Sequence, residues 1–341
     1  MRDVSPGGST PSRRLVVAGG LGLIGTAVVS LSGCGIRLED DAPRVPLLPT
    51  RTPLAGEDAM LALLAAVRSA ADSAVSPPSS LAGLVQPLHE QQATVLHDAL
   101  RSRGVPEADL TPSPTATATG TPTTTPTGTP VATPSPSGSN SAPSTTLDAL
   151  ESVVIEAGAG LDDAEEELRP MLLGILAQAH AGLDLAGHPA PPPTDESSSD
   201  SAGSAWTDVT PVATLITAIR RATYFTQIAA ARSTKDQRAA MLRDLAALAT
   251  VTRELVGTAG DRAPEPELGL PLPHAVTTDE EARRLAAESA GDLLAAWGGE
   301  LATLADGSPE AAFSDVPRWL GTVAAVAHRR GVALTAFPGL K

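Results

Sequence analysis

The sequence predicts an all-α protein made of two tandem four-helix bundles with ferritin-like topology. Apolar residues recur at steps of three and four in eight stretches, and no stretch alternates as a strand would. Alanine and leucine are abundant and aromatic residues make up only 2% of the chain, a composition that favours helix. Each half contains two helices, a long connection and two more helices, which is the order of a bundle with one long crossover.

The first 33 residues have the organisation of a secretory signal. A polar start ends in Arg13 and Arg14, an apolar run extends from Leu15 to Leu31, and small residues precede Cys34. The apolar run contains four glycines, and it is shorter than the ~20 apolar residues that a membrane-spanning helix needs. We therefore predict that residues 1–33 form a signal peptide that is removed.

The cleavage region Leu31-Ser32-Gly33-Cys34 resembles a complete lipobox, in which an aliphatic residue and two small residues precede a cysteine. The resemblance implies cleavage before Cys34 and attachment of lipid to its thiol. Two or more acyl chains anchor a protein durably, whereas one chain binds only marginally. The expected location is the extracytoplasmic face of the cell membrane, with the membrane as a partner through Cys34.

The export route has two candidates. The segment Ser12-Arg13-Arg14-Leu15-Val16-Val17 resembles a twin-arginine signal, and a glycine-rich, weakly hydrophobic core suits the Tat route. The aromatic residue usual two positions after the arginine pair is missing. We favour Tat export through Arg13 and Arg14, and Sec export stays open.

The mature chain divides by composition. Residues 34–56 contain four prolines and no helical period, so we expect an extended spacer. The N-terminal bundle covers 57–187 and is interrupted by a Thr/Pro/Ser tract at 111–145, which lacks aromatic residues and which we expect to be disordered. A Pro/Ser/Asp-rich linker at 188–205 leads to the C-terminal bundle, 206–341.

The helices are predicted from their apolar stripes and end signals. Thr278 followed by Glu281 is a capping box that starts the seventh helix, and Ser308-Pro309 is a cap and first-turn pair for the eighth. The stripes cover residues 60–71, 81–99, 147–168, 173–183, 212–226, 242–255, 286–304 and 319–330.

Charge and cysteine content exclude several classes of function. The formal net charge of −15 repels nucleic acid, so we expect no nucleic-acid partner. Cys34 is the single cysteine. A disulfide within the chain, a cysteine-based zinc site and an iron–sulfur cluster are therefore excluded.

The last third of the chain resembles an actinobacterial ferritin-like domain family of unknown function (DUF4439). The similarity covers residues 206–340 and is carried by the runs 266–277 (PELGLPLPHAVT), 282–286 (ARRLA) and 335–340 (TAFPGL). The chain departs from the family at His274-Ala275, where Phe-Pro is usual. The resemblance implies a ferritin-like fold and an exported setting, and it implies no activity.

The conventional di-iron site of ferritin-like proteins is not expected. That site needs Glu-x-x-His on two helices, and none of the six histidines follows a glutamate by three residues. His89 and His97, about 12 Å apart along one helix by its rise per residue, are too distant to share an ion. No nucleophile elbow or phosphate loop occurs either. We therefore predict no catalytic residue, no metal site and no cofactor.

Two features keep alternatives open. His180 lies on the apolar stripe of its helix, where we favour a buried histidine hydrogen-bonded to a carbonyl or carboxylate over a metal ligand. The acidic run at 162–167 is interpreted as a solvated helix face rather than a calcium or magnesium site.

Our leading functional hypothesis is a non-enzymatic, membrane-tethered helical protein that binds or scaffolds an envelope protein or ligand. The alternative is a divergent ferritin-like metal-binding or redox protein with a non-standard site that uses His180 and acidic residues.

Overall fold

The computed structural model describes residues 51–73, 75, 78–111, 145–189 and 206–340. Residues 52–341 form one compact unit, separate from residues 1–51. Within the described ranges every regular element is helical, and β-type pairing is limited to an isolated bridge between Val75 and Thr145. The predicted all-α class is therefore confirmed for this part of the chain.

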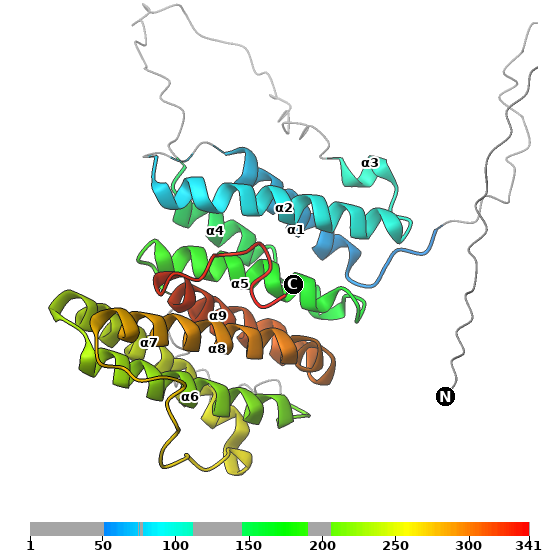
Figure 1. Ribbon diagram of the computed structural model, residues 1–341. Coiled ribbons are helices and arrows are strands. Elements are labelled where there is room, and N and C mark those ends of the chain that lie inside the picture. Colours follow the sequence, from blue (N-terminus) through cyan, green and yellow to red (C-terminus); the bar gives the residue numbers. More distant parts are fainter. Residues whose placement is uncertain (1–50, 74, 76–77, 112–144, 190–205, 341) are drawn as a thin grey trace, which may run out of the picture. The chain divides into compact units, whose positions relative to one another are not determined.

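The helices fall into two groups, one before and one after the predicted linker at 188–205 (Figure 1). We call residues 57–187 the first half and residues 206–340 the second half. The first half contains α1 (Glu57–Asp72), α2 (Ser80–Ser102), α3 (Glu107–Leu110), α4 (Leu147–Glu156), η1 (Leu161–Asp163) and α5 (Arg169–Leu185). The second half contains α6 (Thr210–Arg232), α7 (Lys235–Ala259), η3 (Gly260–Arg262), α8 (Asp279–Gly307) and α9 (Pro309–Arg329).

The long helices of the two halves have the same order of neighbours. In the first half α1 and α5 each pack against both α2 and α4. In the second half α6 and α9 each pack against both α7 and α8. The pair α4 and α5 lies between α1/α2 and α8/α9 in Figure 1. Each half is therefore a ring of four helices, in which the first and fourth helices are bridged by the second and third.

The two halves are joined chiefly along α5 and α9. Gly321 of α9 makes this crossing close, since a Cβ there would lie 2.5 Å from the Cβ of His180 and 2.8 Å from the carbonyl oxygen of Ala177. Leu173 and Ala177 of α5 belong to the same buried cluster as the core of the second half. The apolar core is thus continuous from one half to the other.

The third predicted helix is shorter than its apolar stripe. Helix α4 ends at Glu156, and the chain turns through Gly160, whose φ of +80° is costly for residues other than glycine. Leu161, Ala164 and Leu168 are nevertheless buried, although a 3₁₀ turn and irregular backbone carry them. The prediction of one helix over 147–168 was therefore wrong beyond residue 156.

The two predicted helix starts in the second half are both present, but one cap works differently. Thr278 and Glu281 form the expected reciprocal capping box at the start of α8. Helix α9 starts at Pro309 as predicted, yet the Ser308 hydroxyl does not cap it. Instead that hydroxyl accepts a hydrogen bond of 2.7 Å from the backbone N–H of Thr207, which fixes the entry to α6.

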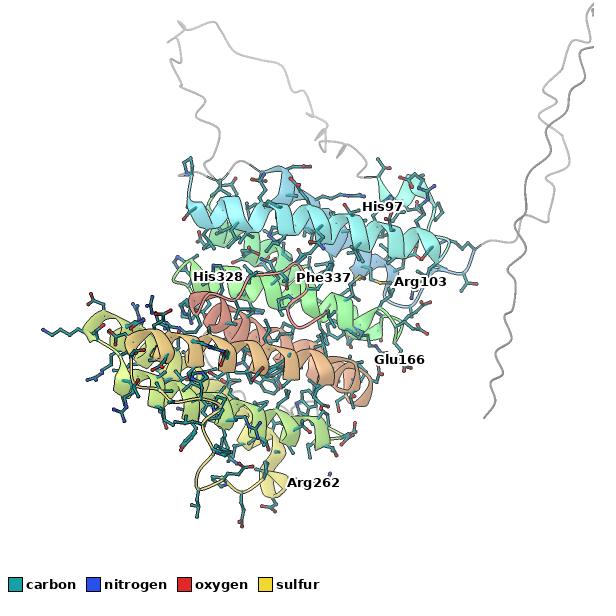
Figure 2. The ribbon with its side chains drawn as sticks, in the orientation of Figure 1. His97, Arg103, Glu166, Arg262, His328 and Phe337 are labelled. Atoms are coloured by element: carbon teal, nitrogen blue, oxygen red, sulfur yellow. The ribbon has the colours of Figure 1, made fainter. Side chains whose placement is uncertain are left out.

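The C-terminal segment runs back between the halves (Figure 2). Phe337 packs against the core of the first half, where Gly174 of α5 leaves room for it. Gly339 lies against Gly298 of α8, so closely that a Cβ at either position would overlap the other backbone. The Phe-Pro-Gly ending therefore fills the seam between α5 and α8.

Candidate functional site

The residues predicted to attach the protein to the membrane lie outside the described residues. They are Arg13, Arg14, Leu31, Ser32, Gly33 and Cys34. In the described part of the chain, no helix is both long enough and apolar enough to cross a bilayer.

His180 occupies the contact between α5 and α9. Its Nδ1 is buried and has no hydrogen-bond partner among the described residues, so the carbonyl or carboxylate that we expected there is missing. Burial, together with the charge of Arg318, lowers the pKa of His180 from 6.5 to about 4. The imidazole is therefore neutral at pH 7, and the nearby guanidinium opposes binding of a cation.

The acidic run at 162–167 is not a helix face. Asp162 and Asp163 belong to η1, and Glu165 to Glu167 lie in the turn before α5. Glu165 accepts a hydrogen bond of 2.7 Å from Arg103 Nε, which ties this turn to the end of α2. Among the described residues no group of three or more histidine, cysteine, aspartate or glutamate side chains is arranged to hold a metal ion.

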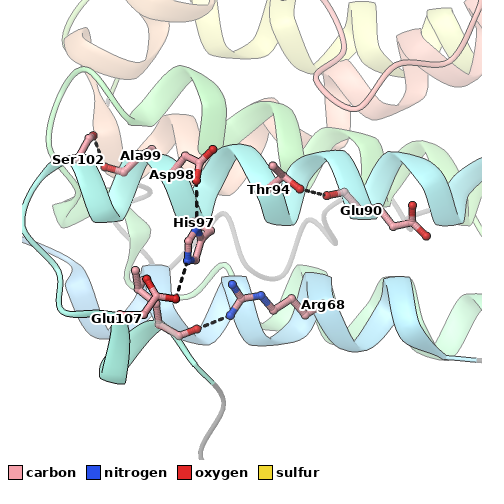
Figure 3. A network of polar contacts seen from close by, with 9 residues as sticks. Arg68, Glu90, Thr94, His97, Asp98, Ala99, Ser102 and Glu107 are labelled. Atoms are coloured by element: carbon pink, nitrogen blue, oxygen red, sulfur yellow. Dashed lines mark hydrogen bonds and ion pairs between the residues drawn. The ribbon is translucent and has the colours of Figure 1, made fainter. Parts of the chain in front are cut away.

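His97 belongs to a surface network that docks α3 (Figure 3). Its Nδ1 lies 3.1 Å from Asp98 Oδ1 and its Nε2 lies 3.3 Å from Glu107 Oε1. Arg68 of α1 donates to the carbonyl oxygen of Leu110, at the other end of α3. Because Glu107 and Asp98 are largely exposed, the network fixes a short helix and encloses no site.

A buried polar network that the sequence did not predict crosses the interior of the first half. His89 Nδ1 donates to Gln92 Oε1 at 2.8 Å, and His89 Nε2 lies 3.3 Å from Glu151 Oε1. Gln92 Nε2 donates to Gln178 Oε1 at 3.1 Å and to the carbonyl oxygen of Ala336 at 2.6 Å. The network thus links α2, α4 and α5 to the C-terminal segment.

Glu151 enters this network because residue 182 is glycine, where a Cβ would overlap the carboxylate. Burial raises the pKa of Glu151 above 4.5, although His89 and Gln178 oppose the rise. Burial lowers the pKa of His89, but the hydrogen bond and charge of Glu151 outweigh it and leave the pKa above 6.5. Both raised pKa values favour a proton held between the two facing atoms of the His89–Glu151 contact.

A cleft of about 700 Å³ lies between the halves, where the end of α5 meets α7 and α9. Two of its arginines are neutralised. Arg329 binds Asp184 at 2.9 Å and Asp244 at 2.8 Å, and Arg318 pairs with Glu254. Since two of the three guanidinium groups of this cleft already have carboxylate partners, we explain it as part of the joint between the halves.

A second cleft, of about 580 Å³, lies between α6 and α7 under the connection that leads to α8. We call it the crossover cleft. Its volume falls within the roughly 300–1,000 Å³ of ligand pockets. Its walls are formed by Thr217, Arg220, Arg221, Thr223, Tyr224 and Gln227 of α6, by Ala249, Thr252, Arg253 and Val256 of α7, and by Pro264, Glu265, Pro266, Glu267 and Leu270.

The crossover cleft follows from helical spacing. Residues 217, 220, 221 and 224 share one face of α6, and residues 249, 252, 253 and 256 share one face of α7. Arg220 donates to the carbonyl oxygen of Pro264, which holds the connection over the cleft. On α6 the four residues at this spacing are all polar, which was the available signal, and an apolar-stripe search passes over it.

Several polar groups in the crossover cleft are unpaired. Arg221 and Arg253 are exposed and make no hydrogen bond or ion pair with any described residue. The Thr223 hydroxyl is buried without a partner, although Thr217 on the same helix bonds the carbonyl of Ala213. An unpaired buried hydroxyl costs about 1–3 kcal/mol.

Comparisons with known proteins do not assign this arrangement, because no protein-family model, curated protein or solved structure matches the chain.

Proposed function

We propose that this protein is a lipid-anchored binding protein on the extracytoplasmic face of the cell membrane, and that the crossover cleft is its binding site. The observation that carries the proposal is the pair of guanidinium groups in that cleft, Arg221 and Arg253, which have no partner among the described residues. The lipobox at Cys34 and the proline-containing spacer support a tethered setting.

A binding role is favoured over a catalytic one by the chemistry of the cleft. As the described residues form it, the cleft is lined by arginine, threonine, tyrosine and glutamine, without histidine or cysteine. Its carboxylates, Glu265 and Glu267, are exposed and have no nucleophile paired with them. General acid–base or nucleophilic catalysis needs such a pair within hydrogen-bonding reach.

The repeated order of helix neighbours supports the view that both halves are ferritin-like bundles with a long crossover. The resemblance of residues 206–340 to the DUF4439 family stays a prediction. The metal-binding or redox alternative has no observation in its favour at His180, because the charge that lowers its pKa is the Arg318 cation.

The proposal is tested by filling the cleft in the compact unit, residues 52–341. The probe is phenylnaphthylamine, a neutral dye whose fluorescence rises in apolar surroundings. Ala249→Trp places an indole in the crossover cleft from an exposed position of α7, and Ala246→Trp makes the same change at an exposed position in the cleft between the halves.

We expect the dye to bind the wild type and Ala246→Trp with similar affinity, and to lose at least tenfold in affinity for Ala249→Trp. Thermal unfolding of both variants verifies that the fold is retained. Equal binding to all three proteins, or no binding to any, would rule out the crossover cleft as a site for ligands of this size.

A further inference from the structure

We infer that the crossover cleft takes a small molecule with a single carboxylate on an apolar body, an inference that depends on the proposed function and names its ligand class. The cleft has three chemically distinct parts. They are an arginine wall, an apolar floor, and a rim that carries two carboxylates.

The arginine wall provides the recognition of an anion. Arg221 of α6 and Arg253 of α7 both line this cleft, and neither has a partner among the described residues. Arg221 also borders a separate cleft between α6 and α8. A guanidinium presents a planar fork of donors that matches a carboxylate.

The apolar floor provides the body of the site. Ala249 and Val256 of α7 line the cleft together with Leu270, Pro264 and Pro266 of the connection. A ligand made only of charged groups would leave this surface exposed to water, whereas an alkyl or aromatic body would cover it and gain from the burial of apolar area. The ligand is therefore amphiphilic.

The rim limits the charge of the ligand. Glu265 and Glu267 lie on the connection that covers the cleft, and the whole chain carries a formal charge of −15. Each further negative charge on a ligand is repelled by these carboxylates over roughly a Debye length, about 8 Å at physiological salt. The three arginines of the lining, Arg220, Arg221 and Arg253, and its two glutamates leave a formal net charge of +1. One negative charge balances it, which favours a carboxylate over a phosphate monoester.

A matched pair of probes isolates the anion. Anilinonaphthalenesulfonate and phenylnaphthylamine share one aromatic skeleton and differ by a single sulfonate, which stands in for the ligand's carboxylate. We expect the sulfonate probe to bind the wild-type unit about tenfold or more tightly than the neutral one, since one good charged hydrogen-bonding contact supplies that factor.

The variant Arg221→Gln/Arg253→Gln keeps amide donors and removes both charges. We expect this variant to bind the two probes with equal affinity. The affinity for the sulfonate probe should fall, and the affinity for the neutral probe should stay unchanged. Arg243→Gln is the matched control, because Arg243 is an exposed arginine of α7 that lies outside the crossover cleft. We expect that variant to behave as the wild type.

Competition then separates the headgroups. We expect decanoate to displace the sulfonate probe at a lower concentration than decyl phosphate, and decanol to be the weakest competitor. Equal affinities of the two probes for the wild type, an unchanged ratio in the arginine variant, or stronger competition by decanol or decyl phosphate would each overturn the carboxylate assignment. If Ala249→Trp leaves both probes bound, the proposed function itself fails.

Discussion

Gly298 of α8 and Gly339 of the C-terminal segment are in backbone-to-backbone contact, and neither position has room for a Cβ. Two further groups hold the same segment, since Gln92 donates to the carbonyl of Ala336 and Phe337 packs over Gly174. The segment is therefore fastened to α2 and α5 of the first half and to α8 of the second.

The contact predicts opposite effects for two neighbouring glycines. Gly298→Ala forces the segment away from α8, and we expect it to lower the free energy of unfolding by about 2 kcal/mol or more. Gly299→Ala adds a methyl group to an exposed helical position with open space around it, where alanine stabilises helix by up to about 1 kcal/mol. Urea unfolding of both variants measures the difference, and equal effects would show that the segment is not seated on α8.

His180 predicts a loss of stability in acid. Its pKa is about 4 in the folded protein, compared with an ordinary value of 6.5. Burial and the charge of Arg318 both oppose protonation of the imidazole in the folded state. The contribution of neutral His180 to the free energy of unfolding is complete above pH 6.5. It declines as pH falls toward 4, by up to about 3 kcal/mol. Urea unfolding measures the free energy of unfolding at pH 7 and at pH 4.5. Between these two pH values it should fall by about 2 kcal/mol less in His180→Leu than in the wild type. An unchanged difference would mean that His180 does not titrate in this window.

The His89–Glu151 contact predicts the opposite pH dependence. The pKa of His89 is raised above 6.5, so its contribution is complete below that pH and is lost as pH rises through the folded-state pKa. Removal of the shared proton leaves the imidazole lone pair facing a carboxylate. We expect the wild type to lose stability between pH 6.5 and 9, and Glu151→Gln to lose much less, since an amide can donate to the ring.

Glu90→Gln is the control for that experiment, because Glu90 is an exposed residue of the same helix as His89. Its pH profile should follow the wild type. Parallel profiles for the wild type and Glu151→Gln would show that the buried pair holds no proton in this range.

The prediction of lipid attachment is tested at Cys34 by expression of the full chain in a bacterium that processes lipoproteins. We expect the wild type in the membrane fraction as a cleaved, lipid-bearing protein, verified by mass spectrometry of the mature N-terminus. Cys34→Ala should accumulate as an unprocessed or mislocalised precursor, and Ser32→Ala, which keeps a small residue before the cysteine, should be processed normally. Cleaved, membrane-held protein in the Cys34→Ala variant would refute lipid attachment.

Local signals in the sequence were sufficient for much of the fold. The capping box of Thr278 and Glu281 and the proline at residue 309 start their helices as predicted, because their contacts lie within one turn. The apolar stripe at 147–168 led to the wrong prediction of one continuous helix. Leu161, Ala164 and Leu168 are all buried, so the apolar pattern continues across a break in the helix. Gly158 and Gly160 were the available warning.

Long-range relationships were beyond the sequence. The crossing at Gly321 and His180 joins residues far apart in the chain, and no periodicity encodes which small residue faces which helix. The crossover cleft was not predicted from the sequence for a different reason. Two of its three arginines, Arg221 and Arg253, lie on exposed faces of α6 and α7, where polar residues are the rule, so the sequence does not mark them as lining one cleft.

Amide hydrogen exchange of the compact unit, residues 52–341, with and without saturating anilinonaphthalenesulfonate, tests the location of the binding site most directly. Ligand that fills the crossover cleft should slow exchange in residues 217–227, 249–256 and 264–270, with no change in α1 and α2 of the first half. Protection confined to residues 184–189 and 318–329, at the cleft between the halves, would contradict the assignment of the crossover cleft as the site.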